Sequence, residues 1–155
     1  MRAQDLVAEL TQLASEGLIR NLNSMPEERR DWKAESTSRS ALNQIWECAT
    51  VNERFAEFLT GRSTGPLSFK ILGELWKSET PDTCEALIER LKIATAGLSE
   101  AIRGLTDEQL NEMVQINPEN QIPTKMLMYM GLRNMWYHTG QIAYIQSLYG
   151  DIEMH

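Results

Sequence analysis

Histidine and cysteine are scarce in this chain. Its 155 residues include two histidines, His138 and His155, and two cysteines, Cys48 and Cys84. The cysteines form neither a CxxC pair nor a zinc-finger spacing, so we predict two buried thiols and not a disulfide or a zinc finger. The motifs GxxxxGK, GxGxxG, GxSxG and HExxH are absent. The sequence therefore lacks the common nucleotide-binding, hydrolase and protease signatures.

Basic clusters and long apolar runs are also missing. The formal net charge is −7, whereas a nucleic-acid-binding protein needs a positive face for the phosphates. No apolar stretch is long enough to span a bilayer, and the N-terminal residues do not resemble a signal peptide. We expect one cytoplasmic domain over residues 1–155, with a small molecule as its partner and not nucleic acid or a membrane.

Helical periodicity dominates the sequence, and no segment alternates convincingly between apolar and polar residues as a strand does. The spacing predicts four long helices, each with an apolar stripe, over residues 6–22, 38–59, 80–104 and 124–150. Because an amphipathic helix must bury its stripe against a neighbour, four such helices predict an all-α four-helix bundle.

The connections between the helices contain residues that start or stop helices. Thr80, Pro81 and Asp82 suit the N-cap and first turn of the third helix. Thr106 and Gln109 have the spacing of a capping box, which predicts a short helix. A further short helix is predicted over residues 67–78. Loops are predicted over residues 26–38 and 117–123. The bundle should therefore have long crossover connections and short extra helices.

The last predicted helix is apolar almost all round, and it includes Met126, Met130 and Trp136. A helix of that kind is central in a fold or covers a partner's surface. The methionines are more typical of core packing than of a cofactor site. We therefore predict that this helix is either central or covers the surface of a partner, and a homodimer is the assembly that its composition favours.

Three segments resemble the DinB/YfiT-like family. RRDWKAESTSRSA is similar to the family's tryptophan-containing loop, and NQIWECATVNERFAEFL is similar to the helix that follows it. NMWYHTGQIAYIQSLYG is similar to the pattern in which a histidine pair precedes Gly-Gln and a terminal glycine. Here His138, Gly140, Gln141 and Gly150 match that pattern.

The resemblance implies a four-helix bundle, often dimeric, with a divalent metal, usually zinc or nickel. Three histidines hold that metal, one from the second helix and two that lie four residues apart on the last helix. Characterised members of the family include transferases that use a low-molecular-weight thiol, such as bacillithiol or mycothiol. The resemblance thus implies a metal-dependent enzyme of the thiol S-transferase or hydrolase type.

This chain departs from that ligand pattern. His138 is retained, but Asn134 stands four residues before it, where the family has histidine. On the second helix the matching residue is Glu47 or, with the register shifted by one, Cys48. The sequence similarity favours Glu47, whereas helical phase favours Cys48, because Glu47 points away from the apolar stripe at about 100° per residue. Both residues remain candidates.

The candidate metal ligands are Glu47, Cys48, Asn134 and His138. An asparagine amide is a weak ligand, so this set offers fewer strong ligands than the three of a catalytic zinc site. Without a metal, Glu47 and His138 could form a catalytic acid–base pair. Alternatively, Asn134, His138 and Gln141 form a hydrogen-bonded polar cluster in the core. The chain would then be a metal-free module that binds a small molecule or a second copy of itself.

Overall fold

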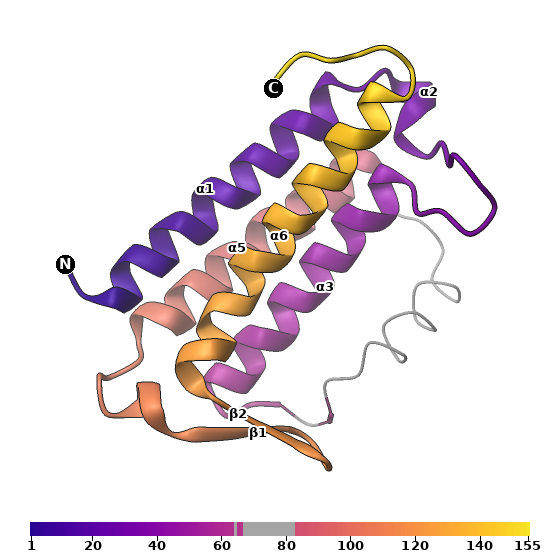
Figure 1. Cartoon of the computed structure of the whole chain (residues 1–155). Helices are drawn as coiled ribbons and strands as arrows, with labels where there is room; N and C mark the ends of the chain where they lie inside the picture. The colour runs from indigo at the N-terminus through magenta and orange to yellow at the C-terminus, as the bar shows by residue number, and fades with distance from the viewer. Residues whose placement is uncertain (64, 67–82) are drawn as a thin grey trace.

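The computed structural model describes residues 1–63, 65–66 and 83–155, and it is dominated by four long helices (Figure 1). The apolar stripe predicted for the third long helix is buried at Leu87, Leu91, Leu98 and Ile102. In the first long helix Leu18 and Leu22 are buried as predicted, whereas Leu6 and Leu13 are exposed. The predicted four-helix bundle is therefore confirmed. The long helices are α1 (Ala3–Ser24), α3 (Ala41–Leu59), α5 (Cys84–Arg103) and α6 (Thr124–Ser147).

The helices do not follow one another around the bundle. α1 packs against α5 and α6, and α3 also packs against α5 and α6, whereas α1 and α3 lie diagonally and scarcely touch. α1 and α6 run in one direction, and α3 and α5 run in the other (Figure 1). Since α3 and α5 are parallel neighbours, the end of α3 and the start of α5 lie at opposite ends of the bundle. The predicted long crossover would join these two ends.

Side-chain caps determine where two of the long helices begin. The Ser40 hydroxyl accepts a hydrogen bond from the Asn43 backbone N–H at 3.2 Å, and the Thr83 hydroxyl accepts one from Ala86 at 3.2 Å. The helices consequently start at Ala41 and Cys84, later than predicted, because each cap satisfies a free N–H of the first turn. The predicted cap and first turn at residues 80–82 and the predicted short helix at 67–78 lie outside the described residues.

The connection before α6 contains a β-hairpin, so the predictions of a loop and of no strand were wrong. β1 (Met113–Asn117) pairs antiparallel with β2 (Asn120–Pro123). Val114 and Ile122 are opposite one another and pack against the part of the core that contains Phe55, Ile102 and Leu127. Tertiary packing thus stabilises strands that are too short to show a clear alternation.

Two short helices complete the connections. η1 (Gln109–Asn111) follows the predicted capping box, in which the Thr106 N–H donates to Gln109 Oε1 at 2.8 Å and the Gln109 N–H donates to Thr106 Oγ1 at 3.3 Å. α2 (Glu27–Arg30) lies in a stretch predicted as a loop. It has no buried residue, so its sequence carries no apolar stripe by which to predict it.

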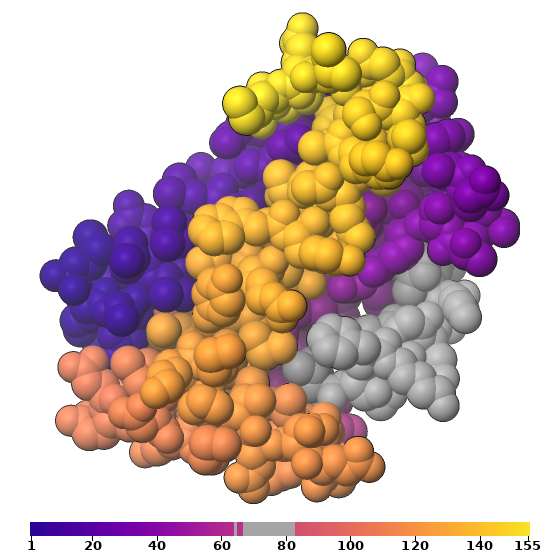
Figure 2. All heavy atoms as spheres, in the orientation of Figure 1, coloured from indigo at the N-terminus to yellow at the C-terminus, as the bar shows by residue number. Residues whose placement is uncertain are grey.

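α6 lies on the surface of the bundle and does not run through its centre. Its inner side, with Leu132, Met135 and Ile142, is buried, while its outer side is uncovered in the described part of the chain (Figure 2). Of the two predicted alternatives, the central position therefore does not hold, and the cover of a partner's surface stays a prediction. The outer face leaves several large side chains at least partly exposed to solvent: Met126, Tyr129, Trp136, Tyr137, Tyr144 and Leu148. Among the described residues, no helix has both the length and the hydropathy needed to cross a membrane.

Candidate functional site

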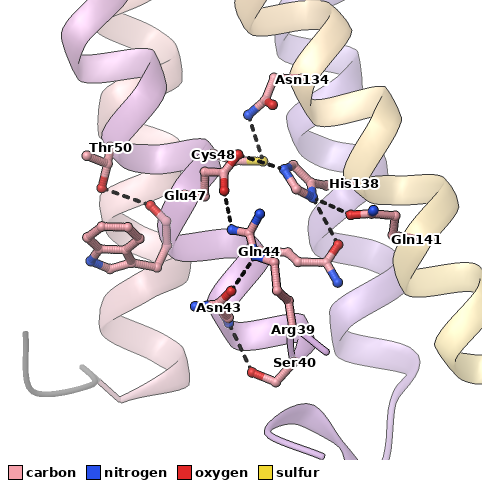
Figure 3. A network of polar contacts seen from close by, with 11 residues as sticks. Arg39, Ser40, Asn43, Gln44, Glu47, Cys48, Thr50, Asn134, His138 and Gln141 are labelled. Carbon is pink, nitrogen blue, oxygen red and sulfur yellow. Dashed lines mark hydrogen bonds and ion pairs between the residues drawn. The ribbon is translucent and has the colours of Figure 1, made fainter. Parts of the chain in front are cut away.

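His138 on α6 faces Glu47 on α3 in the interface between these antiparallel helices (Figure 3). The imidazole is 1% exposed, and its Nε2 lies 3.1 Å from Glu47 Oε1. An ionised carboxylate can only accept hydrogen bonds, so the Nε2–H group of His138 donates a hydrogen bond to Glu47. The structure therefore brings together the two residues that the sequence singled out as an acid–base pair.

Two glutamine side chains approach the other nitrogen of the imidazole. His138 Nδ1 lies 3.0 Å from Gln44 Oε1 and 2.9 Å from Gln141 Oε1. Two hydrogen-bonding states fit these distances. In the first, the ring is a cation and donates from both nitrogens. In the second, the ring is neutral and one amide turns over, so that its NH₂ group donates to Nδ1.

Arg39 occupies the second oxygen of the Glu47 carboxylate. Its Nη2 forms an ion pair with Glu47 Oε2, and its Nε donates to Asn43 Oδ1 at 2.6 Å. Burial alone would raise the pKa of the Glu47 carboxyl, but the hydrogen bond from His138 and the charge of Arg39 outweigh it and hold this pKa below its ordinary value. Glu47 is therefore ionised at neutral pH and is held between the Arg39 guanidinium and the Nε2–H group of His138.

Cys48 and Asn134 form a separate contact beside this pair. The Asn134 amide donates to Cys48 Sγ at 3.7 Å, and Cys48 is completely buried. Burial raises the pKa of the Cys48 thiol well above its ordinary value, so the sulfur stays protonated at neutral pH. Cys84, which was also predicted to be buried, is only partly so.

The choice between Glu47 and Cys48 depends on where the neighbouring helix lies. The phase of α3 turns Cys48 toward the core, as the helical-phase reasoning predicts. However, α6 packs along the edge of that face, so Glu47 reaches His138 with 15% of its side chain exposed. Of the two candidates, Glu47 is the residue that contacts His138.

The residues present do not fit the three-histidine metal site that the family resemblance implies. The described residues contain no group of three or more His, Cys, Asp or Glu side chains placed to hold a metal ion. Both Glu47 oxygens are engaged, and the Arg39 charge beside them opposes a second cation. Of the other two candidates, Asn134 is an amide and thus a weak ligand, and Cys48 is fully buried and would have to lose its proton to bind a metal.

Two hollows flank the polar residues. A cavity of about 220 Å³, here called the inner cavity, is lined by Glu47, Asn134 and Tyr137 together with apolar residues and Arg133. A larger hollow of about 490 Å³ is here called the outer groove. One wall is α6, and the other is the loop that precedes α3. Tyr137 lines both and packs edge-on against the His138 ring at 5.3 Å between centroids. The residues that line the outer groove include Arg39, Gln44, Tyr137, Gly140, Gln141 and Tyr144.

We call Arg39, Gln44, Glu47, His138 and Gln141 the His138 network. From the sequence, Arg39 was predicted only as part of the segment that resembles the family's loop, and Gln44 was not predicted as a site residue. No helical spacing signals this contact, because Arg39 precedes α3 and side-chain pairs along a helix lie three or four residues apart, not eight. The ion pair forms because the Arg39 side chain lies back along α3 toward Glu47 (Figure 3).

The fold and the site define a four-helix bundle in which α3 and α5 run parallel and in which α3 and α6 share a buried histidine–carboxylate pair. A family model described as the DinB superfamily matches residues 9–142. The chain belongs to the DinB superfamily.

Several solved structures have the same fold. A conserved protein from Enterococcus faecalis is similar with a TM-score of 0.76 and 16% identity, covering 96% of this chain and 97% of its own. YfiT from Bacillus subtilis, described as a probable metal-dependent hydrolase with an unusual four-helix bundle topology, is similar with a TM-score of 0.76 and 16% identity. That alignment covers 97% of this chain and 90% of YfiT.

A mycothiol-dependent maleylpyruvate isomerase is also similar, with a TM-score of 0.70 and 15% identity, and the alignment covers 91% of this chain and 61% of the isomerase. At these identities the likeness establishes the fold alone. No curated protein matches the chain.

Proposed function

We propose that this chain is a metal-free member of the DinB superfamily that binds a small organic molecule beside the His138 network. One observation carries the proposal: the Glu47 carboxylate is held on one oxygen by His138 and on the other by Arg39. An internal cation thus neutralises the carboxylate that would otherwise be the strongest anionic ligand for a metal.

The surroundings of the network support the binding of a small molecule. The inner cavity and the outer groove each give access to it from one side, the first at Glu47 and the second at Arg39 and Gln141. Small-molecule sites are usually concave, largely apolar and furnished with a few fixed polar groups. A ligand that reaches Glu47 would meet a carboxylate and an imidazole that share a hydrogen bond, so Glu47 and His138 are also the residues to exchange a proton with it.

Metal retention tests the proposal directly. The untagged protein is incubated with zinc or nickel, desalted and subjected to elemental analysis. We expect far less than one metal ion per chain, with no difference between the wild type and the variant His138→Ala. About one ion per chain, lost in His138→Ala and retained in His155→Ala, would overturn the proposal. That result would favour a metal-dependent hydrolase or thiol S-transferase with Glu47, His138 and a weaker third ligand.

A second candidate function is a homodimeric interaction module, and the outer face of α6 favours it. Trp136 is 49% exposed and Tyr144 is 66% exposed on a helix whose outer side carries no acidic residue, in a chain with a net charge of −7. Two copies could therefore meet on this face without repulsion between carboxylates. Light scattering at several concentrations tests this function, and a monomer at all of them would exclude it.

A further inference from the structure

We propose that the outer groove binds a flat organic anion, with the acidic group on Arg39 and the ring system lying across Gly140. This site presupposes the metal-free binding function proposed above and adds to it the place and the chemical class of the ligand. Four features carry the inference: an unexplained glycine, a pair of tyrosines, an open arginine edge and the absence of acidic residues from the groove lining.

Gly140 has no role in the described structure that requires a glycine. It lies inside α6, and positive φ values occur only at Gly61 and Gly150, so its backbone would accept any residue. A Cβ atom added at Gly140 would have no described neighbour within 4 Å, so packing does not exclude a side chain either. A glycine inside a helix costs about 1 kcal/mol of stability relative to alanine. Gly140 lines the outer groove, where the missing side chain leaves room for a ligand.

Two tyrosines stand on either side of this gap. Tyr137 and Tyr144 are seven residues apart, which places them on the same face of α6 about 10 Å apart along the axis. Their side chains are 62% and 66% exposed, and both line the outer groove. A flat ring laid over the Gly140 backbone would contact an aromatic side chain at each end. Aromatic contacts of this kind prefer offset-stacked or edge-on geometry, both of which a shallow groove permits.

Arg39 presents an unused edge to the groove. Its Nε and Nη2 atoms are fixed by Asn43 and Glu47, whereas Nη1 makes no hydrogen bond within the described part of the chain. Its side chain is 40% exposed and lines the outer groove, so we assign Nη1 as the atom that meets the ligand. A guanidinium that is already oriented loses little freedom when it binds a carboxylate, and charge-assisted hydrogen bonds of this kind are strong.

The charge of the groove selects an anion. Arg39 is the only charged residue among the described residues that line it, although the chain as a whole carries a net charge of −7. The remaining polar lining consists of neutral groups that can donate hydrogen bonds, among them Ser38 and Gln141. Arg39 is paired with Glu47, which does not line the groove, so an anion there would meet the remaining edge of a guanidinium whose charge is already partly balanced, and no carboxylate from the described lining. Flat aromatic or conjugated carboxylates match both the charge and the shape.

Calorimetric titration with 2-naphthoate tests the site, with the neutral 2-naphthamide as a matched ligand. The variants are Gly140→Gln, which fills the groove, and Gly97→Gln, which adds the same side chain at an exposed helical position on α5 where a Cβ atom also has no described neighbour. We expect 2-naphthoate to bind the wild type and Gly97→Gln equally, and Gly140→Gln at least about tenfold more weakly. The amide should bind the wild type at least about tenfold more weakly than the acid does, a difference of about 1.4 kcal/mol.

Three outcomes would overturn the inference. Equal binding of 2-naphthoate to Gly140→Gln and to the wild type would remove Gly140 from the site. Equal binding of the acid and the amide to the wild type would remove the interaction with Arg39. The absence of any 2-naphthoate binding at millimolar concentration would reject the ligand class, while the metal analysis would still decide the proposed function separately. The mass of each sample is measured by light scattering, and a dimer lost in Gly140→Gln with unchanged 2-naphthoate binding would assign Gly140 to an interface instead.

Discussion

α3 and α6 meet in two different ways along their shared interface. In its packed half, a Cβ atom added at Gly131 would lie 2.5 Å from Leu98 Cδ2 and 2.8 Å from Asn52 Oδ1, so glycine is what lets the helices approach. In its polar half, nine residues later, Gly140 faces open space beside the His138 network. The same residue type thus produces close contact in one half and a groove in the other. The difference is what we expect if the first half stabilises the bundle and the second half has the binding role proposed above.

The largest expected effect is in the polar half, where His138→Ala should lower the free energy of unfolding by about 3 kcal/mol. The substitution removes a buried ring and leaves Glu47 without its donor, while Gln44 and Gln141 lose their shared partner. Urea unfolding monitored by circular dichroism measures the change. A loss below about 1 kcal/mol would show that the network adds little stability and would make the contrast between the halves sharper.

Gly131→Ala comes next and tests the packed half. The new methyl group would overlap Leu98 and the Asn52 side chain, and overpacking of this kind costs about 2 kcal/mol. The gain in helix propensity over glycine offsets part of this cost. The same urea experiment measures the result. An increase in stability would mean that Leu98 of α5 and Asn52 of α3 move aside easily. The distinction between the two halves would then fail.

Gly140→Ala should have the opposite sign and a smaller size. With no described atom near the new methyl group, alanine should raise the free energy of unfolding by about 1 kcal/mol through helix propensity alone. Gly97→Ala is the matched control, since it is also helical and open. The two variants should agree in thermal and urea unfolding. A clearly smaller gain at Gly140 would reveal a contact at this position that the described structure does not contain.

The smallest effect is the pH dependence that Glu47 contributes. Its pKa is lowered on folding from an ordinary value of 4.5, because the hydrogen bond from His138 and the charge of Arg39 outweigh burial. This contribution to stability is therefore complete above pH 4.5 and is lost as the pH falls through the lower pKa of the folded state. Urea unfolding on both sides of pH 4.5 should show a shallower acid-side loss in Glu47→Gln than in the wild type. Parallel curves would mean that Glu47 is not held by its two partners.

The sequence predicted the long helices because each has a stripe that repeats over several turns, as Leu87, Leu91 and Leu98 do in α5. It failed at the hairpin, where Val114 and Ile122 are too few to establish an alternation and acquire their role only by packing against the core. The start of α5 was predicted too early, because Thr83 caps the helix and an equally suitable threonine precedes it.

The candidate site could be predicted only in part. His138 was identified because a single histidine in an apolar helix needs hydrogen-bonding partners. Glu47 and Cys48 could not be separated, since helical phase orients a side chain without telling where the next helix packs. The outer groove was beyond prediction for a similar reason, because it forms only where α6 and the loop before α3 come together.

The diagonal arrangement of α1 and α3 has a consequence for how the chain acquires its structure. These helices precede the other two long helices but scarcely touch, and each buries its apolar side against α5 and α6. Until the ribosome has made residues 84–147, both helices lack the neighbours that cover them. A nascent chain that has reached only the end of α3 therefore exposes two apolar stripes to chaperones. Contacts that span so much sequence also slow folding, so α1 becomes stable only when α5 and α6 dock together on it.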